Sequence, residues 1–406
     1  MTRLEELIER LCPDGVEYKS LGDVATITRG GNFQKKDYVE QGFPCIHYGQ
    51  IYTKYNLFVT ETISHISNEK AKQQKKAEPG DIIMAVTSEN IEDVCKCIAW
   101  LGDSKVAVSG HAAIIHHNLN PKFLAYYLSS SLFYKQKLSM VQGTKVIEVS
   151  PEKLKKITLP VPPLEVQQEI VRILDQFTEL TAELTAELTA RKKQFEFYRS
   201  SILRSCKNAQ VKTLGEICDF VRGPFGGSLK KEIFKTHGYA VYEQQHAIYG
   251  MFHFRYFIDK EKYETMRRFA VAPGDLLMSC SGTMGKITIV PKDAPAGIIN
   301  QALLKLTPKK EIDNRYLKYC FEDTVTEQMN LNARGGAIKN VASVAVLKTI
   351  QIQVPPITEQ RRIVAILDRF DALCNDLTSG LPAEIAARQK QYEYYRDKLL
   401  AFPQKK

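Results

Sequence analysis

Long hydrophobic runs are missing from this sequence. Among its 406 residues, no apolar stretch approaches the roughly 18 residues that a membrane-spanning helix needs. The first residues, MTRLEELIERL, have the spacing of an amphipathic helix and lack the apolar core of a signal peptide. We therefore expect no membrane contact, and a protein that stays in the cytoplasm.

Clusters of metal-binding or disulfide-forming residues are also missing. The nine cysteines are odd in number and scattered, which predicts free thiols in a reducing compartment. Cys95 and Cys97 are close together, but a C-x-C pair without a second Cys/His pair nearby does not make a zinc site. The histidines show no pairing at helical spacing beside carboxylates. We expect no metal in this chain.

Complete catalytic motifs are missing as well. Asn120-Pro121-Lys122-Phe123 is close to the N-P-P-[FY] loop of amino-methylating enzymes, but the chain has no glycine-rich loop for S-adenosylmethionine. A helix that begins with an Asn cap and Pro121 explains the same residues. The run Gly282 to Lys286 lacks the earlier glycine of an ATP-binding loop, because Cys280 stands in its place. We therefore expect no catalytic residues.

The overall composition is that of an ordinary globular protein. Hydrophobic residues make up 44% of the chain and charged residues 25%, and the length suits two to four domains. The formal net charge is +10, which favours a polyanionic partner such as nucleic acid.

The sequence contains one long unit written twice. Leu21-Gly22-Asp23-Val24 reappears as Leu214-Gly215-Glu216-Ile217, and Val161-Pro162-Pro163 reappears as Val354-Pro355-Pro356. Both offsets are 193 residues. Most residues between these anchors differ. The two units therefore share a common frame, defined by the anchor residues, but differ in most of the sequence between them.

Each unit has a β-rich part followed by a helical part. Short apolar runs between glycines and prolines predict strands, as at 81–86 and 286–290, and one helix is expected in each β-rich part, at 121–128 and 314–321. The expected class is therefore α+β. We place an N-terminal segment at 1–20, the first globular domain at 21–157, a helical spacer at 158–212, the second globular domain at 213–350 and a C-terminal helical region at 351–406.

The helical parts carry apolar residues at steps of three, four and seven, which is typical of a coiled-coil seam. The first helix is expected from Leu164 to Arg204, and the second should break and restart at Gly380-Leu381-Pro382. Tandem Thr-Ala-Glu-Leu tetrads in the first helix suit either a length-setting element or a plain helix face. The seam residues that we expect on the spacer or against a partner are Leu180, Leu184, Leu188, Phe195, Tyr198, Phe370, Leu373, Leu377, Tyr392 and Tyr395.

These features together predict two α+β domains separated by two long antiparallel coiled-coil helices, with a pseudo-twofold internal repeat. The stretch Leu4 to Leu21 is similar to Ile202 to Leu214, so the repeat should be closed by the N-terminus meeting the C-terminal helix. Such internal symmetry would present like surfaces to two identical partners.

At this point the sequence resembles the specificity subunits of type I restriction-modification systems. The resemblance covers essentially the whole chain and rests on the exits "LPVPPLEVQQEIVRILDQF" and "IQVPPITEQRRIVAILDRF", on the helix ends "RKKQFEFYR" and "RQKQYEYYRDKLL", and on the tetrads. The tetrads look most like the subgroup that repeats them in the central helix. Inside the domains, "GFPCIHYGQIY", "YAVYEQQHAIYG" and "SGTMGK" match family patterns, whereas the first domain departs from the last of these at Thr87-Ser88-Glu89-Asn90.

The resemblance implies a non-catalytic subunit whose two target-recognition domains each read half of a bipartite, asymmetric site in double-stranded DNA. It implies two methyltransferase subunits and the restriction subunits as partners. S-adenosylmethionine, ATP and Mg would then be bound by those partners and not by this chain.

Basic and polar clusters are the candidates for DNA contact, since Lys and Arg neutralise phosphates while Gln, Asn and Arg pair with purine edges. We expect the loop Gln244-Gln245-His246 to contact bases. The full set of candidates is Arg29, Lys35, Lys36, Tyr48, Gln50, Tyr52, Lys54, Lys230, Lys231, Tyr242, Gln244, Gln245, His246, Arg255, Lys339 and Asn340.

Two other classes stay open at this stage. A coiled-coil scaffold or adaptor without sequence-specific DNA binding would share the helices, but it would not require two divergent domains on one frame. An enzyme with an unrecognised site would need converging acid, base or metal groups. Salt-dependent binding of duplex DNA separates the first reading from both.

Overall fold

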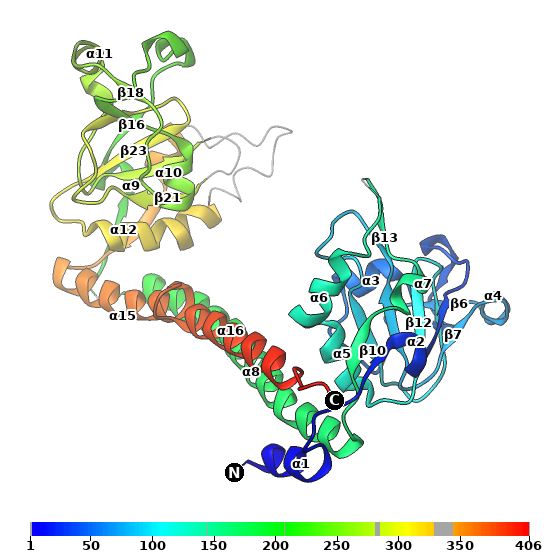
Figure 1. The fold of residues 1–406 in the computed structure, drawn as a ribbon. Coiled ribbons are helices and arrows are strands. Elements are labelled where there is room, and N and C mark those ends of the chain that lie inside the picture. Colours follow the sequence, from blue (N-terminus) through cyan, green and yellow to red (C-terminus); the bar gives the residue numbers. More distant parts are fainter. Residues whose placement is uncertain (1, 144, 207, 281–284, 329–343, 406) are drawn as a thin grey trace. The chain divides into compact units, whose positions relative to one another are not determined.

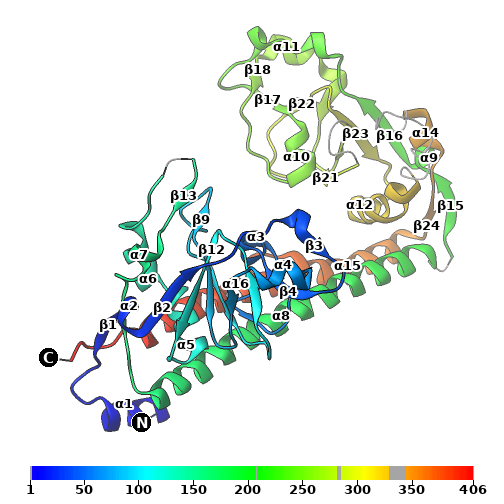
Figure 2. The ribbon, with the colours of Figure 1, turned by 90° about the vertical axis from the view of Figure 1, so that its right-hand side faces the viewer.

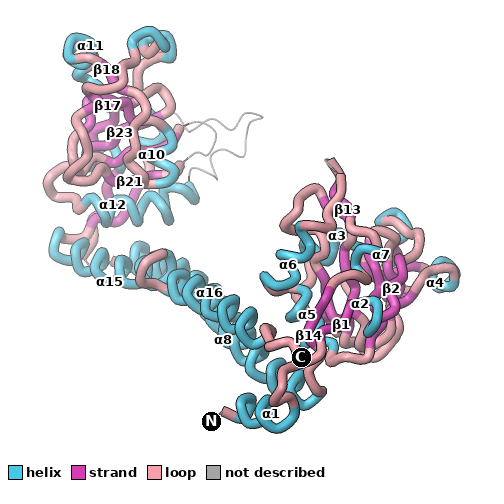
Figure 3. Tube along the Cα trace, viewed as in Figure 1, coloured by secondary structure: helices cyan, strands magenta, loops and turns pink. Residues whose placement is uncertain are grey.

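The computed structural model describes residues 2–143, 145–206, 208–280, 285–328 and 344–405. They form two compact units: unit 1 contains residues 1–185 and 384–406, and unit 2 contains residues 186–383. Figure 3 shows that each unit combines a domain of mixed strands and short helices with part of the long helices. The expected α+β class and the duplicated architecture are thus confirmed.

The central sheet of unit 1 is buried on both faces. Strand β8 (Ile82–Ala85) sends Ile82 and Met84 into one hydrophobic cluster and Ile83 and Ala85 into another, because successive side chains of a strand point to opposite faces. This explains why the strand is a continuous apolar run in the sequence. The sheet has the order β2 (Ala25–Arg29), β12 (Ala112–His117), β8, β10 (Cys97–Trp100) and β5 (Phe58–Val59).

A second sheet of unit 1 carries the first candidate site. Its strand β4 (Phe43–Ile46) pairs in parallel with β11 (Val106–Val108), with Cys45 opposite Ala107. Its order is β3 (Tyr38–Val39), β6 (His65–Ile66), β4, β11 and β7 (Lys76–Ala77). Two short pairs, β1 (Tyr18–Ser20) with β14 (Thr158–Pro160) and β9 (Thr87–Ser88) with β13 (Ile147–Glu148), complete the strands of this unit in the described part of the chain.

Helix α5 (Pro121–Leu128) covers the central sheet of unit 1. The Asn120 side chain accepts the backbone N–H groups of Lys122 and Phe123, so the expected Asn cap is confirmed. The other helices of unit 1's domain and N-terminal segment are α1 (Arg3–Leu11), α2 (Leu21–Val24), α3 (Tyr48–Thr53), α4 (Asn68–Lys72), α6 (Ser131–Leu138) and α7 (Pro151–Leu154).

Unit 2 repeats the frame in its strand order. Its central sheet runs β16 (Cys218–Arg222), β23 (Leu303–Pro308), β20 (Leu276–Ser279) and β21 (Ile287–Ile289). Its second sheet runs β18 (Phe257–Ile258), β17 (Tyr239–Tyr242), β22 (Gly297–Ile299) and β19 (Ala270–Val271), and β15 (Gln210–Thr213) pairs with β24 (Gln351–Val354). Strands β17 and β22 are parallel, as are β4 and β11 in unit 1. The helices of this domain include α9 (Leu214–Ile217), α10 (Gln244–Tyr249), α11 (Lys260–Thr265), α12 (Asn314–Cys320) and α14 (Val344–Thr349).

Three long helices make up the spacer. Helix α8 (Leu164–Arg204) has the bounds expected from its hydrophobic period. Within unit 2 it lies beside α15 (Ile357–Asn375), and the pair is antiparallel, because Phe195 stacks on Phe370 at 6.3 Å while Ile202 lies near the earlier Ile363. Helix α16 (Leu381–Leu399) restarts after a turn, as expected from Gly380-Leu381-Pro382 (Figure 1).

The two ends of the chain meet in unit 1. The backbone N–H of Val16 donates to Pro403 O at 2.9 Å, and Lys405 N–H donates to Val16 O at the same distance. The Tyr18 hydroxyl donates to Phe402 O at 2.9 Å. The N-terminal segment is therefore hydrogen-bonded to the residues that follow the C-terminal helix, as a closed repeat requires. Among the described residues, no helix has the length and apolarity for a membrane crossing.

Candidate nucleic-acid interface

Each unit places a short helix directly after the strand that takes part in the parallel pair. Helix α3 follows β4 in unit 1, and α10 follows β17 in unit 2. Helix α3 contacts the central strand β8, and α10 contacts β20 and β21. Figure 2 shows α10 beside β21. The sequences "GFPCIHYGQIY" and "YAVYEQQHAIYG" are thus the same structural element in two copies.

The third residue of each helix caps its N-terminus. Gln50 Oε1 accepts the backbone N–H of His47 at 2.9 Å, and His246 Nδ1 accepts that of Glu243 at 2.7 Å. The remaining polar atoms are also used: Gln50 Nε2 donates to Ser64 Oγ at 2.6 Å, and His246 Nε2 lies 3.0 Å from His253 O. Both side chains are buried. In this structure they hold the helix ends, and at most 8% of either residue's surface is accessible.

The expected loop at Gln244-Gln245-His246 is wrong as a statement of local structure. These residues form the first turn of α10, because Glu243 has extended backbone and acts as its N-cap. Tyr242 before them is fully buried in β17, and its hydroxyl donates to Pro295 O at 2.7 Å. Gln244 and Gln245 are partly exposed at the start of the helix.

Glu243 contacts two of the polar candidates of unit 2, Arg255 and Gln245. Its carboxylate accepts two hydrogen bonds from Arg255, both at 2.9 Å, and it lies 3.5 Å from Gln245 Nε2. The Arg255 side chain remains 62% exposed. A bidentate pair fixes the orientation of a guanidinium group, so Arg255 and Gln245 lie together beside the Glu243 carboxylate.

The tyrosine candidates of unit 1, Tyr48 and Tyr52, make ring contacts and one hydroxyl hydrogen bond within the domain. Tyr48 lies 5.0 Å from the His111 ring and 6.3 Å from Tyr52. The Tyr52 hydroxyl donates to Thr87 O at 2.6 Å, and burial raises its pKa. Tyr52 therefore ties α3 to the segment where the first domain departs from the family pattern.

The cationic candidates are exposed. In unit 1, Arg29 ends β2 and forms an ion pair with Glu148, while Lys54 follows α3. Lys35 lies close enough to His47 that, after burial, its charge is the next cause of the lowered pKa of that histidine. The other exposed cations of the set are Lys36 in unit 1 and Lys230 and Lys231 in unit 2, whereas Lys339 and Asn340 lie outside the described residues.

The spacer candidates differ in their surroundings. Phe177 stacks on Tyr395 at 5.5 Å in unit 1, and Tyr392 is buried there. In unit 2, Tyr198 lies 6.0 Å from Phe370. The remaining seam leucines are Leu184 and Leu188, which are half-buried, and Leu180 and Leu373, which are 38% and 40% exposed.

Leu377 is a correction to the expected seam. It is 80% exposed and lies in the turn between α15 and α16. The reason is Asp376, whose carboxylate accepts the Thr378 N–H at 2.7 Å and both the Thr378 and Ser379 hydroxyls at 2.6 Å. These bonds lower the pKa of Asp376 and end the helix before Leu377 can join its face.

A duplicated polar joint, which the sequence reading missed, binds each domain to its spacer helix. Gln167 Oε1 accepts the Asn120 N–H at 2.9 Å, and its Nε2 donates to Pro162 O at 2.8 Å. Gln360 does the same in unit 2, with Asp313 N–H at 2.8 Å and Pro355 O at 2.9 Å. Both glutamines are buried. Their common offset of 193 was the signal that could have identified them.

Carboxylates extend this joint about two turns further along the helices. Asp175 accepts the Tyr126 hydroxyl at 2.8 Å and pairs with Lys122 at 2.6 Å. In unit 2, Asp368 accepts the Tyr319 hydroxyl at 2.8 Å and pairs with Arg315. The joint therefore fixes the orientation of each domain on its own spacer helix.

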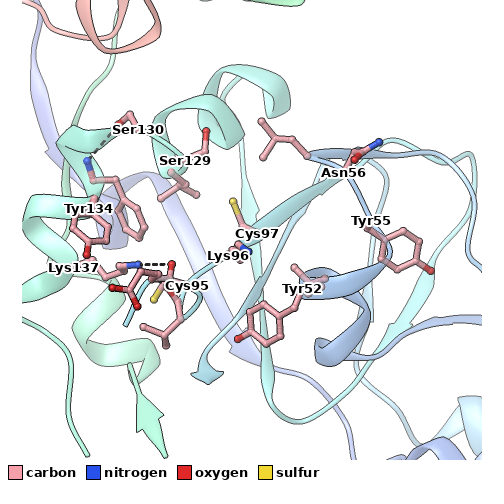
Figure 4. Close-up of a pocket in the computed structure, with 16 residues that line it drawn as sticks. Tyr52, Tyr55, Asn56, Cys95, Lys96, Cys97, Ser129, Ser130, Tyr134 and Lys137 are labelled. Carbon is pink, nitrogen blue, oxygen red and sulfur yellow. Dashed lines mark hydrogen bonds between the residues drawn. The ribbon is translucent and has the colours of Figure 1, made fainter. Parts of the chain in front are cut away.

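A cavity of about 350 Å³ in unit 1 carries no reactive group (Figure 4). It is lined by Cys95 and Cys97, and burial raises the pKa of each thiol to about 12. The Lys137 ammonium group donates to the carbonyls of Ile91 and Val94, at 2.8 and 3.0 Å. Thiols held protonated are poor nucleophiles. All nine cysteines are free, as expected, and the described residues contain no group of His, Cys, Asp and Glu that could hold a metal.

Two domains built on one frame, each with exposed cations and each hydrogen-bonded to a long helix, are the arrangement of a protein that binds a polyanion through two like surfaces. The family model for the type I restriction modification DNA specificity domain matches residues 13–191 and again residues 207–387. The chain belongs to this family of DNA specificity subunits, which are not the catalytic subunits of their systems.

Individual relatives agree with this assignment. A type I restriction enzyme specificity subunit of Haemophilus influenzae is 29% identical over 99% of this chain and 98% of its own length. A type I restriction enzyme specificity subunit of Escherichia coli is 36% identical over 61% of this chain and 64% of its own length. A solved structure from work on complex assembly and conformational transition of the type I restriction-modification system shares the fold, with a TM-score of 0.70 at 19% identity, over 96% of this chain and 98% of that one.

Proposed function

We propose that the first domain of this specificity subunit reads one half of a bipartite DNA site and that the second domain reads the other half. The observation that supports this most is that the strands common to the two domains follow the same order, while the side chains at matching positions differ, such as those of the Tyr48 helix in one and the Gln244 helix in the other. One frame with two sets of exposed residues suits two different base sequences.

The exposed cations act on the phosphates, and the partly exposed amides act on the bases. Lys35, Lys36, Lys54 and Lys230 would supply affinity that does not depend on sequence, since phosphate contacts position a protein without reading bases. Gln245 and its neighbours on α10 would make the selective contacts.

The partners of the chain are two methyltransferase subunits and the restriction subunits, and the complex works in the cytoplasm. S-adenosylmethionine, ATP and Mg bind to those partners. The closed internal repeat supports a pair of like partners, because it gives the chain two similar surfaces. The tetrads of α8 support membership of the subgroup in which such tetrads are repeated in the central helix.

Exchange of one domain tests the division of labour. Residues 22–157 are replaced by the first domain of another family member, and the methylated sites are mapped genome-wide in cells that hold the methyltransferase partner. One half-site should change and the other should stay. Exchange of the second domain is the matched control and should change only the other half. A change in both halves after either exchange contradicts the proposal.

A further inference from the structure

Phe225 is the most exposed large hydrophobic side chain among the described residues, with 93% of its surface accessible. It lies between β16 and the 3-10 turn Gly226–Ser228, in the run Arg222-Gly223-Pro224-Phe225. Burial of a phenylalanine ring normally stabilises the folded protein, and a ring exposed to water does not contribute this stabilisation. The domain's own packing therefore does not explain this position.

The backbone around Phe225 is anchored on both sides. A Cβ at Gly223 would lie 1.8 Å from Asn300 O, so only glycine allows this approach to the turn before β23. The Gly223 N–H donates to Leu303 O at 3.0 Å, and the Phe225 carbonyl accepts the Ser228 N–H at 2.9 Å. The ring thus projects from a held backbone.

The first domain shows that this frame does not force an aromatic ring into solvent. Gly30 stands 193 residues before Gly223 and has the same close approach, with its Cβ position 2.2 Å from Ser109 O. Asn32 occupies the position of Phe225. The aromatic residue that follows, Phe33, is 3% exposed and packs in a core cluster. Exposure of the ring is a property of the second domain alone.

Positive charge flanks the ring along the chain. Arg222 precedes it, Lys230 and Lys231 follow it, and all three are exposed, with Glu232 as the nearest acid after them. Cations that contact phosphates, together with one apolar side chain that reaches past them, suit duplex DNA, whose base steps can be opened by an apolar wedge.

We propose that Phe225 inserts between adjacent base pairs of the half-site read by the second domain. The ring then selects sequence through the ease with which a given step unstacks, in addition to any contact with base edges. This inference rests on the proposed function, namely that the second domain reads DNA.

The test uses the complex of the full chain with its methyltransferase subunits and duplexes that carry the mapped site. The fluorescent base 2-aminopurine is placed at successive steps across the second half-site. The wild-type complex should raise its fluorescence at one step, where stacking is lost. Phe225→Ala should abolish this rise and weaken binding by about tenfold with an unchanged salt dependence, because stacking is lost while no phosphate contact is removed. Phe225→Trp should retain the rise.

The controls separate the outcomes. Asn32→Ala, at the matched position of the first domain, should leave the second half-site signal intact. Thermal unfolding of the Phe225→Ala chain should match the wild type, since the ring is almost wholly in solvent. A wild-type complex without sequence-specific DNA binding would overturn the proposed function itself. Normal affinity and normal fluorescence for Phe225→Ala would overturn the wedge alone, as would a defect confined to binding of the methyltransferase subunits.

Discussion

Removal of the Gln167 amide should loosen the joint between the first domain and helix α8. The side chain is 3% exposed, and its two ends hold the Asn120 N–H and the Pro162 carbonyl. Gln167→Ala leaves both groups buried without a partner. A buried polar group without its hydrogen bond costs about 1–3 kcal/mol. The free energy of unfolding of unit 1 should therefore fall by about 2–4 kcal/mol, with partial relaxation included.

The expected change in melting temperature follows from the size of the unit. For a domain of roughly 200 residues, 1 kcal/mol corresponds to about 2–4 °C, so calorimetry should show unit 1 melting about 4–16 °C earlier. Hydrogen exchange measured by mass spectrometry gives the local readout. The Asn120 amide donates to Gln167 in this structure, so a peptide that covers it should exchange faster in the variant.

Two controls make this prediction refutable. Gln168→Ala removes an exposed amide one residue further along and should change stability by less than about 0.5 kcal/mol. Gln360→Ala should instead accelerate exchange at Asp313 in unit 2 and leave Asn120 unchanged. If Gln167→Ala and Gln168→Ala give equal melting temperatures and equal exchange at Asn120, the joint does not stabilise the domain as argued.

The tetrads, the polar side chains of the second domain and the half-buried His117 provide three further predictions. Insertion of one Thr-Ala-Glu-Leu after Leu188 adds roughly 6 Å of helix, so methylation mapping should show a gap longer by one or two base pairs between unchanged half-sites; an unchanged gap would reduce the tetrads to a helix face. Gln245→Ala should relax sequence choice, whereas Lys230→Ala should weaken binding to all duplexes equally, as measured by titration of cognate and random DNA. Burial lowers the pKa of His117 from 6.5 to about 4, so the unfolded chain takes up the proton first and unit 1 should lose up to about 3 kcal/mol as the pH falls from 6.5 to 4. His117→Asn should flatten that part of the stability profile, and an equal slope in both proteins would refute the assignment.

Local signals in the sequence were sufficient for α5 and the long helices, but not for short helices such as α10. The bounds Pro121–Leu128 and Leu164–Arg204 follow from an Asn cap, a proline at the first helical position and an unbroken apolar period, all of which are read within a few turns. The break before Pro382 is of the same kind. The continuous apolar run of β8 likewise predicted a strand, and the structure shows that it is covered on both faces.

Contacts between residues that are distant in the sequence could not be predicted from such local signals. Gln50 and His246 have the chemistry of base-reading side chains, but their bonds to Ser64 and His253 bury them, and no local pattern predicts those partners. Leu377 had the right spacing for a seam and was lost to a turn built by the side chain of Asp376. The residue type alone does not distinguish a polar side chain that faces DNA from one that is hydrogen-bonded within the protein.

Within the joint, the internal repeat helps to separate these two uses. Gln167 and Gln360, like Asp175 and Asp368, are kept at an offset of 193, and the structure shows all four hydrogen-bonded there. Where the copies differ, as at Asn32 and Phe225, the side chain lies at the surface. Groups inside the joint must satisfy fixed backbone partners, which allows little choice of residue. Exposed groups meet no such demand, so the two recognition surfaces can differ in what they bind while the frame that holds them stays the same.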